Sequence, residues 1–184
     1  MKVKGVDCKD IQLFVKDSFG ESKYKEWVQS LPDESKKIYT GNIIEGFKYE
    51  IKSGFHIPLN CLCEMFYKPR IDKGAIVFGI WSGKRALSSV YKVFLNKDIE
   101  KYAVNIAKVF KIYYETAVDG WSKLDGNKIT AVMTRFEEPD YLCDLSIMGY
   151  FVGGLELLNI KAKSHRLIKS LAKNDEVTEF IIEI

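Results

Sequence analysis

The sequence predicts an α+β fold in which helices pack on an antiparallel sheet of about four strands. Over the first 115 residues, apolar residues recur at three- and four-residue steps, the spacing of amphipathic helices. From residue 117 they alternate instead, first over residues 117–136 and again over residues 161–184, and alternation is typical of strands. With 184 residues and a hydrophobic share of 47%, the chain suffices for one core, so we expect residues 1–184 to form a single domain.

The chain is predicted to begin with a short strand and two helices. Val3–Val6 is apolar and suits a strand edge, and Asp7 is placed to cap the helix that follows it. Gly20 ends this helix because glycine interrupts helical backbone. A second short helix is predicted over Ser22–Leu31.

Turn residues divide the next segment. Pro32 is predicted to begin a helical turn, because proline fits the first turn of a helix. Residues 47–51 alternate and predict a short strand, which Gly54 ends. A helix is then predicted over Pro58–Tyr67.

A long apolar helix over Gly74–Leu95 is predicted to be the central core element. Gly79 and Gly83 lie one turn apart, and interior glycines weaken a helix by about 1 kcal/mol each, so they indicate close approach of another backbone. Residues 96–98 form a polar turn into a helix over Ile99–Glu115. Two long helices joined by so short a turn are expected to pack antiparallel.

The C-terminal part combines two strand pairs with one helix. A hairpin is predicted over residues 117–124 and 128–136, with the turn at 125–127. The helix over Tyr141–Leu158 begins after a capping Asp140, and its glycines again indicate close packing. The glycines of this helix are Gly149, Gly153 and Gly154. The last two strands are predicted over residues 161–170 and 177–184.

Composition excludes several functional classes. The 28 basic and 25 acidic residues give a net charge of only +3, and they are interspersed, so we expect no nucleic-acid partner. No apolar run reaches the roughly 18 residues that a membrane span needs. The first ten residues lack the apolar core of a signal peptide, so we expect a cytoplasmic protein.

The residues that carry most enzyme and metal chemistry form no recognisable cluster. The four cysteines have neither zinc-ligand spacing nor a nearby histidine motif, so we expect no metal site, no disulfide and no catalytic residue. His56 precedes a predicted helix and His165 lies in a predicted strand, where each has an ordinary structural role. The alternative is that His56 binds haem or a metal.

Aromatic side chains gathered in three consecutive helices indicate a pocket. An apolar pocket with a few polar groups is the usual form of a small-molecule site, and Arg85 is suited to hold an anionic head group. The alternative is that the same rings interdigitate at close-packed density and leave no void. The predicted ligand-binding residues are Phe66, Phe78, Trp81, Arg85, Tyr91, Phe110 and Tyr113.

Several blocks in order resemble an uncharacterised bacterial family that is much expanded in myxobacteria. That family looks like a relative of the 4-vinyl reductase domain, whose superfamily also holds haem-NO-binding domains and TRAPP vesicle-tethering subunits. The resemblance implies helices on a four-stranded antiparallel sheet, often with an apolar cavity and often dimeric. The blocks are VKGVDCKDIQLFVKDSFGE, FGIWSGKRALSSVYKVFL with KVFKIYYETA, and MGYFVGGLELLNIKAKSH.

The chain departs from its relatives at two motifs. Where relatives often carry a cysteine pair near the C-terminus, this chain has Ser170 and Thr178, so the resemblance implies no metal or redox role there. The Tyr-x-Ser-x-Arg signature of haem-NO sensors is also missing from the sequence.

Taken together, these features favour a non-enzymatic, cytoplasmic sensory or scaffolding module without a resident cofactor. Such a module would bind a small apolar ligand or a partner protein, and the glycine-flanked helices and the resemblance predict a homodimer. The alternative is a haem- or tetrapyrrole-binding protein, or an enzyme, that uses His56.

Overall fold

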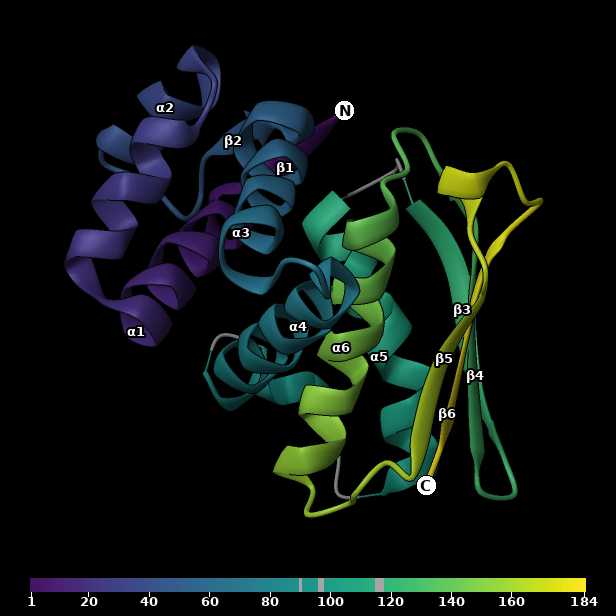
Figure 1. Ribbon diagram of the computed structural model, residues 1–184. Coiled ribbons are helices and arrows are strands. Elements are labelled where there is room, and N and C mark those ends of the chain that lie inside the picture. Colours follow the sequence, from purple (N-terminus) through teal and green to yellow (C-terminus); the bar gives the residue numbers. More distant parts are fainter. Residues whose placement is uncertain (90, 96–97, 115–117) are drawn as a thin grey trace.

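The computed structural model describes residues 1–89, 91–95, 98–114 and 118–184, and the side chains of residues 106 and 109–111 fall outside this description as well. The predicted α+β class is confirmed. Figure 1 shows the first helices on one side, a twisted sheet on the other, and further helices between them. We call residues 1–67 the N-terminal lobe and residues 71–184 the C-terminal lobe.

The N-terminal lobe is a group of helices closed by a two-stranded sheet. Both predicted strands exist and pair antiparallel, with Val3 opposite Tyr49, and Val3 is fully buried. The elements of this lobe are β1 (Lys2–Lys4), α1 (Gly5–Ser30), α2 (Asp33–Thr40), β2 (Lys48–Glu50), a π-helical turn η1 (Lys52–His56) and α3 (Ile57–Tyr67).

Helix α1 begins at Gly5 with Lys4 at its cap position, three residues earlier than predicted, so Asp7 is not its cap. The backbone N–H groups of Gly5 and Val6 donate to the carbonyls of Phe47 and Glu45, at 2.7 and 3.1 Å. Because a neighbouring loop satisfies these first helical donors, no capping side chain is needed. Asp7 lies in the first turn and is buried.

The two predicted glycine breaks have different outcomes. Gly20 interrupts α1 with φ +87°, a conformation that favours glycine, so the two predicted helical segments are confirmed. Gly54 was expected to end the strand, but β2 already ends at Glu50, and Gly54 lies inside η1, which leads directly into α3. A Cβ at Gly54 would lie 2.9 Å from Tyr49 Cβ and 3.0 Å from Cys8 Sγ, so this glycine allows close packing instead.

The C-terminal lobe combines helices with the four-stranded antiparallel sheet, whose strand order is β3-β4-β6-β5. Figure 1 shows α5 and α6 on one face of this sheet. The elements are α4 (Ile71–Ser88), a 3₁₀ turn η2 (Lys92–Phe94), α5 (Ile99–Tyr114), β3 (Val118–Asp125), β4 (Lys128–Phe136), α6 (Tyr141–Leu157), β5 (Ser164–Lys169), a 3₁₀ turn η4 (Leu171–Lys173) and β6 (Thr178–Glu183).

Helices α4 and α6 pack backbone against backbone through reciprocal glycines. A Cβ at Gly79 or Gly83 would collide with the carbonyls of Ser146 or Tyr150 on α6. In return, a Cβ at Gly149 or Gly153 would collide with α4 carbonyls. The predicted close approach at these glycines is confirmed, and its partner lies within the same chain.

The predicted length and partner of the central helix are wrong. Helix α4 ends at Ser88, because the hydroxyls of Ser88 and Ser89 donate to the Arg85 carbonyl at 3.1 and 2.7 Å and compete with helical bonding. Tyr91 therefore lies beyond the helix, and residue 90 falls outside the described residues. The expected antiparallel pairing of α4 with α5 is also wrong, since α4 packs mainly on α6 and α5 mainly on β3.

The sheet follows the predicted alternation. On β4, Ile129, Ala131 and Met133 face the core, and on β6 Phe180 and Ile182 do so. The hairpin between β3 and β4 turns at Gly126, whose φ is +59°. Asp140 caps α6 as predicted, by accepting a 2.9 Å bond from Cys143 N.

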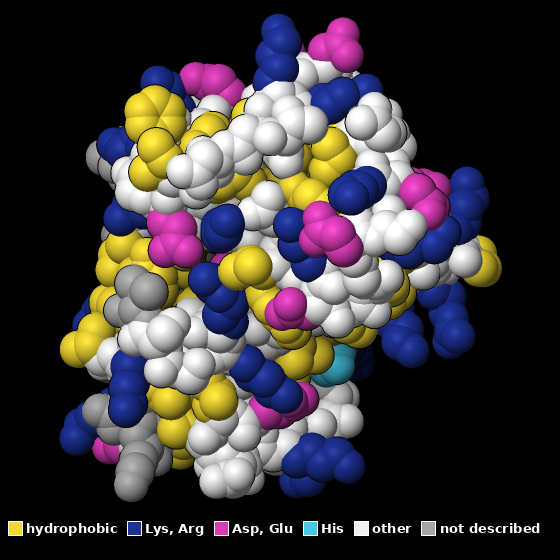
Figure 2. Space-filling view, turned by 90° about the vertical axis from the view of Figure 1, so that its left-hand side faces the viewer, with side chains coloured by type: hydrophobic (Ala, Val, Ile, Leu, Met, Phe, Trp, Pro, Cys, Tyr) yellow, Lys and Arg dark blue, Asp and Glu magenta, His cyan; other side chains and the backbone are white. Residues whose placement is uncertain are grey.

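Surface features bear on the predicted partners. On the face in Figure 2, Lys/Arg and Asp/Glu side chains are interspersed with apolar ones rather than separated by sign. No helix in the described part of the chain is both long and apolar enough to cross a membrane. Residues 142–155 of α6 are buried, so the predicted homodimer has no contact face there and stays a prediction.

Candidate functional site

A small cavity lies where the two lobes meet. Its volume is about 20 Å³, enough for one water-sized guest. Helix α1 and η1 supply walls from the N-terminal lobe, and α4, α5 and α6 supply walls from the C-terminal lobe. The lining combines one carboxylate with five aromatic rings: Asp7, Phe55, Phe78, Tyr113, Tyr114 and Tyr150.

Asp7 is the charged group of this cavity. The residue is only 7% exposed, and its Oδ2 has no hydrogen-bond partner among the described residues. Burial raises the pKa of Asp7 well above its usual value; the charge of Asp10 adds to this, and that of Lys4 opposes it. A buried carboxyl without a partner is costly, so native structures retain few of them.

The three tyrosines are hydrogen-bond donors at neutral pH. Burial raises the phenol pKa of Tyr113, Tyr114 and Tyr150, and the charge of Asp7 is a further cause at each of them. The rings of Tyr113 and Tyr150 meet edge to face at 6.2 Å. The cavity wall on this side is therefore aromatic, with neutral phenols.

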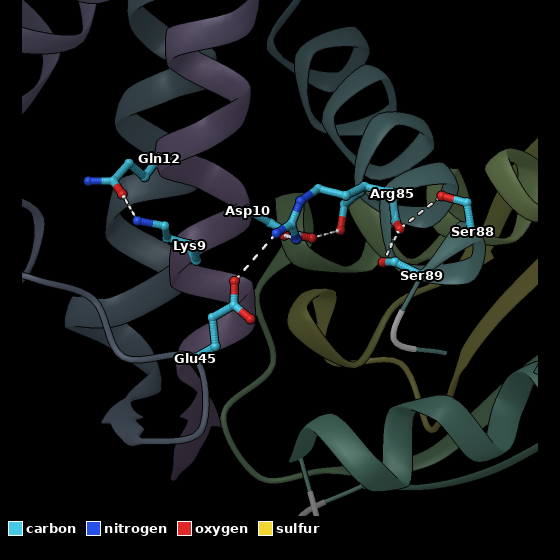
Figure 3. Close-up of polar contacts among 8 residues, drawn as sticks. Lys9, Asp10, Gln12, Glu45, Arg85, Ser88 and Ser89 are labelled. Carbon is cyan, nitrogen blue, oxygen red and sulfur yellow. Dashed lines mark hydrogen bonds and ion pairs between the residues drawn. The ribbon is translucent and has the colours of Figure 1, made fainter. Parts of the chain in front are cut away.

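A polar network adjoins the cavity and connects α1 to α4 (Figure 3). Arg85 forms an ion pair with the fully buried Asp10, and its second nitrogen lies 3.4 Å from Glu45. Ser82, which lines the cavity, donates a 2.6 Å bond to Asp10. Burial raises the pKa of Asp10 to about 6, against the opposing effects of Ser82 and Arg85.

The structure separates the residues predicted to line a pocket. Phe78 and Tyr113 line the interlobe cavity, and Tyr91 lies beside Tyr113 with ring centroids 5.0 Å apart. Trp81 packs edge to face on Phe14. The others take different places: Phe66 stacks on Phe19 at 4.0 Å, Arg85 is paired with Asp10, and the side chain of Phe110 lies outside the described residues.

Of the acidic and aromatic residues that line the cavity, four were not predicted from the sequence. Phe55, Tyr114 and Tyr150 belong to patterns that ordinary core residues share. Asp7 carried a signal, because Asp7 and Asp10 lie three residues apart and so face one side of a helix whose neighbours are apolar. A paired acid on an apolar helix face indicates a buried polar site.

His56 and the four cysteines are not among the residues that line this cavity. His56 is 6% exposed, its Nε2 has no partner in the described part of the chain, and burial lowers its pKa. It borders an open cleft of about 580 Å³ whose walls include Glu137, Glu138 and Asp140. His165 is half-buried on β5.

The thiols are not activated nucleophiles. Burial raises the pKa of Cys63 to about 12, and it also raises those of Cys8, Cys61 and Cys143. A reactive cysteine requires a lowered pKa and access to solvent. Across the described residues, no three His, Cys, Asp or Glu side chains come together as metal ligands.

Comparison with known proteins identifies the fold. No protein-family model matches the chain, and no curated protein matches it significantly. An H-NOX protein from Shewanella oneidensis in the Fe(II)NO state is 18% identical, with a TM-score of 0.71 over 98% of each chain. The Fe(II) unliganded H-NOX protein from K. algicida is 18% identical, with a TM-score of 0.70 over 98% of this chain and 95% of that one.

The chain therefore has an H-NOX-like (haem-NO-binding) fold over nearly its whole length. This confirms the fold that the resemblance implied. At this level of identity the likeness concerns the fold, so the residues of this chain decide what it binds.

The interlobe residues do not fit haem. Haem iron takes an axial ligand from His, Cys, Met or Tyr, and among the described lining residues only tyrosines are of these types. Their phenol pKa values are raised, so they supply no phenolate at neutral pH. The volume of about 20 Å³ is also far below the roughly 300–1,000 Å³ of sites for larger ligands.

Proposed function

We propose that this protein is a non-catalytic sensor module that binds a small ligand between its two lobes. The proposal rests on one observation: Asp7 Oδ2, in a cavity bounded by both lobes, has no hydrogen-bond partner among the described residues. A ligand at this position contacts α1 and η1 on one side and α4, α5 and α6 on the other. Because it touches both lobes, its binding energy favours one arrangement of them, which is how a ligand shifts a conformational equilibrium.

The neighbouring structures support this proposal in general terms. They are H-NOX proteins, and one of them has NO bound at Fe(II). The present chain has their fold, and Asp7 and aromatic side chains line its interlobe cavity. The raised thiol pKa values support a role in binding rather than in covalent catalysis.

Thermal unfolding with a panel of small molecules tests the proposal. A ligand at a hundred times its Kd stabilises the native state by about 2.7 kcal/mol. For a chain of this size, that raises Tm by roughly 5–10 °C. Asp7→Asn should weaken the response, whereas Asp17→Asn, an exposed acid on the same helix, should leave it unchanged. Equal responses in both variants would contradict a site at Asp7.

The second candidate is haem or another tetrapyrrole bound through His56. The observation in its favour is that Nε2 of this buried imidazole has no hydrogen-bond partner in the described part of the chain, and that its lowered pKa leaves it neutral. The carboxylates of Glu137, Glu138 and Asp140 in the adjoining cleft oppose it, since they repel propionates. An absorption spectrum of protein from haem-replete cells separates the candidates: a Soret band lost in His56→Ala supports haem, and its absence supports the interlobe site.

A further inference from the structure

The lobe junction contains more buried negative groups than positive ones. Asp7 and Asp10 are both buried on one face of α1, and a single guanidinium, that of Arg85, lies against them. Asp10 takes the Arg85 ion pair and also accepts the Ser82 bond. Asp7 has neither an ion pair with Arg85 nor a hydrogen bond from Ser82. Its buried carboxyl therefore carries a proton or requires a cation from outside the chain.

The remaining walls suit a cation. Phe55 and Phe78 line the cavity together with the three tyrosines, and aromatic faces attract ammonium groups through the ring quadrupole. The tyrosine oxygens are also acceptors for N–H donors. Among the described residues that line the cavity, none has a Lys, Arg or His side chain.

The size of the cavity limits which ligands can bind in it. A volume of about 20 Å³ holds one group the size of a water molecule. An ammonium ion has that size and carries four N–H donors, which suit a carboxylate and neighbouring phenol oxygens. A larger amine fits only if the lobes separate around it.

We propose that the interlobe cavity binds an ammonium ion, or the ammonium head of a small primary amine, with Asp7 as its counter-ion and the aromatic rings as its walls. This inference names the ligand class of the proposed sensor and rests on that proposed function. It also assigns Asp7 the recognition role.

Binding of the cation is coupled to release of a proton. The protonated Asp7 carboxyl loses H⁺ to solvent as the ammonium ion takes its place beside the carboxylate, so charge balances. The charged or titratable groups that interact with Asp7 come from every element around it. On its own segment they are Lys4, Cys8 and Asp10, and Arg85 on α4 acts through Asp10. The others are Tyr39 on α2, Tyr91 beyond α4, Tyr113 and Tyr114 on α5, and Cys143 and Tyr150 on α6. Because burial raises the pKa of Asp7, affinity for the cation should increase as pH rises and the carboxyl loses its proton.

Calorimetric titration of the full chain with ammonium chloride tests the inference, with NaCl and KCl at equal ionic strength as references. Repeating the titration in buffers of different ionisation enthalpy counts the protons released. We expect saturable ammonium binding that releases close to one proton per ion. Asp7→Asn should weaken binding at least tenfold, and Asp17→Asn should leave it unchanged. Phe78→Leu, which keeps all charges, should weaken it roughly three- to thirtyfold.

Other results overturn the inference in distinguishable ways. Binding of K⁺ or Na⁺ as tight as that of ammonium would contradict recognition of N–H donors. A neutral small molecule that binds without proton release, and whose binding depends on the cavity walls, would overturn the cation and leave the proposed sensor function standing. No response to any ligand class would overturn both.

Discussion

Arg85 on α4 forms an ion pair with Asp10 on α1, and this contact joins the two lobes beside the cavity. Asp10 is fully buried, whereas the Arg85 side chain is 30% exposed. Removal of one partner of such a pair leaves a buried charge uncompensated, which is far more costly than the loss of a surface pair. The stability of the junction therefore depends on Arg85 more than its partial exposure suggests.

Arg85→Leu should lower the free energy of unfolding by about 3–5 kcal/mol at alkaline pH. The loss should be smaller near pH 5, because Asp10, whose pKa is about 6, is then mostly protonated. Urea unfolding at alkaline pH and near pH 5 measures the loss in free energy of unfolding. The adjacent Lys84 pairs with Glu156 at the surface, so Lys84→Leu should change stability by at most about 1 kcal/mol. Equal losses in the two variants would contradict a special role for Arg85.

Gly79→Ala should disrupt the packing of α4 on α6. Its new Cβ would collide with the Ser146 carbonyl, and backbone cannot move aside as a flexible side chain can. We expect a loss of about 3 kcal/mol or more in urea unfolding. Gly46→Ala is the matched control, because a Cβ there meets nothing within 4 Å, and it should stay within about 0.5 kcal/mol of wild type. A well-tolerated Gly79→Ala would mean that the helices are farther apart.

Local patterns predicted the elements that depend on local forces. The strands and the hairpin turn follow from alternation and from a glycine turn, and the start of α6 follows from its Asp140 cap. Close approach at Gly79 and Gly149 was visible because interior glycines are unfavourable in helices. That α4 and α6 are each other's packing partner was not visible, since the choice between α5 and α6 depends on contacts across some 70 residues.

The site was less predictable than the fold, and Asp7 shows why. An aspartate near a helix start is the usual sign of a cap, so the sequence alone assigned that role. The carbonyls of Glu45 and Phe47 satisfy the first donors of α1 and leave Asp7 for the interior. The cavity also unites residues 7, 113 and 150, and no short-range pattern brings such distant residues together.

Leu87→Ala should destabilise the core more than Phe94→Ala. Leu87 is fully buried on α4, so its truncation should cost about 2–5 kcal/mol in chemical denaturation. Phe94 lies in η2 beyond the end of the helix and is only partly buried, so we expect roughly half that loss. A loss below about 0.5 kcal/mol for Leu87→Ala would place this side chain at the surface.

Asp144 should make the protein less stable as pH rises. This fully buried carboxyl at the start of α6 accepts bonds from Ser170 at 2.6 Å and Thr178 at 3.2 Å. Burial raises its pKa to about 7, although these hydroxyls oppose the shift. Between the unfolded pKa near 4 and this value, the native state holds more protons than the unfolded chain, so the free energy of unfolding falls with pH. Over that window Asp144 contributes a loss of up to roughly 4 kcal/mol.

Asp144→Asn should therefore flatten the pH dependence and raise stability near pH 8 relative to wild type. Urea unfolding at several pH values between about 4 and 8 measures the slope. Asp7 and Asp10 act in the same direction and should leave a residual slope in the variant, whereas the lowered pKa of His56 acts in the opposite direction. Asp125→Asn, an exposed change at the end of β3, should keep the wild-type slope. If Asp144→Asn keeps that slope as well, the carboxyl is ionised in the native state throughout this range, and the buried hydroxyls of Ser170 and Thr178 suffice to hold its charge.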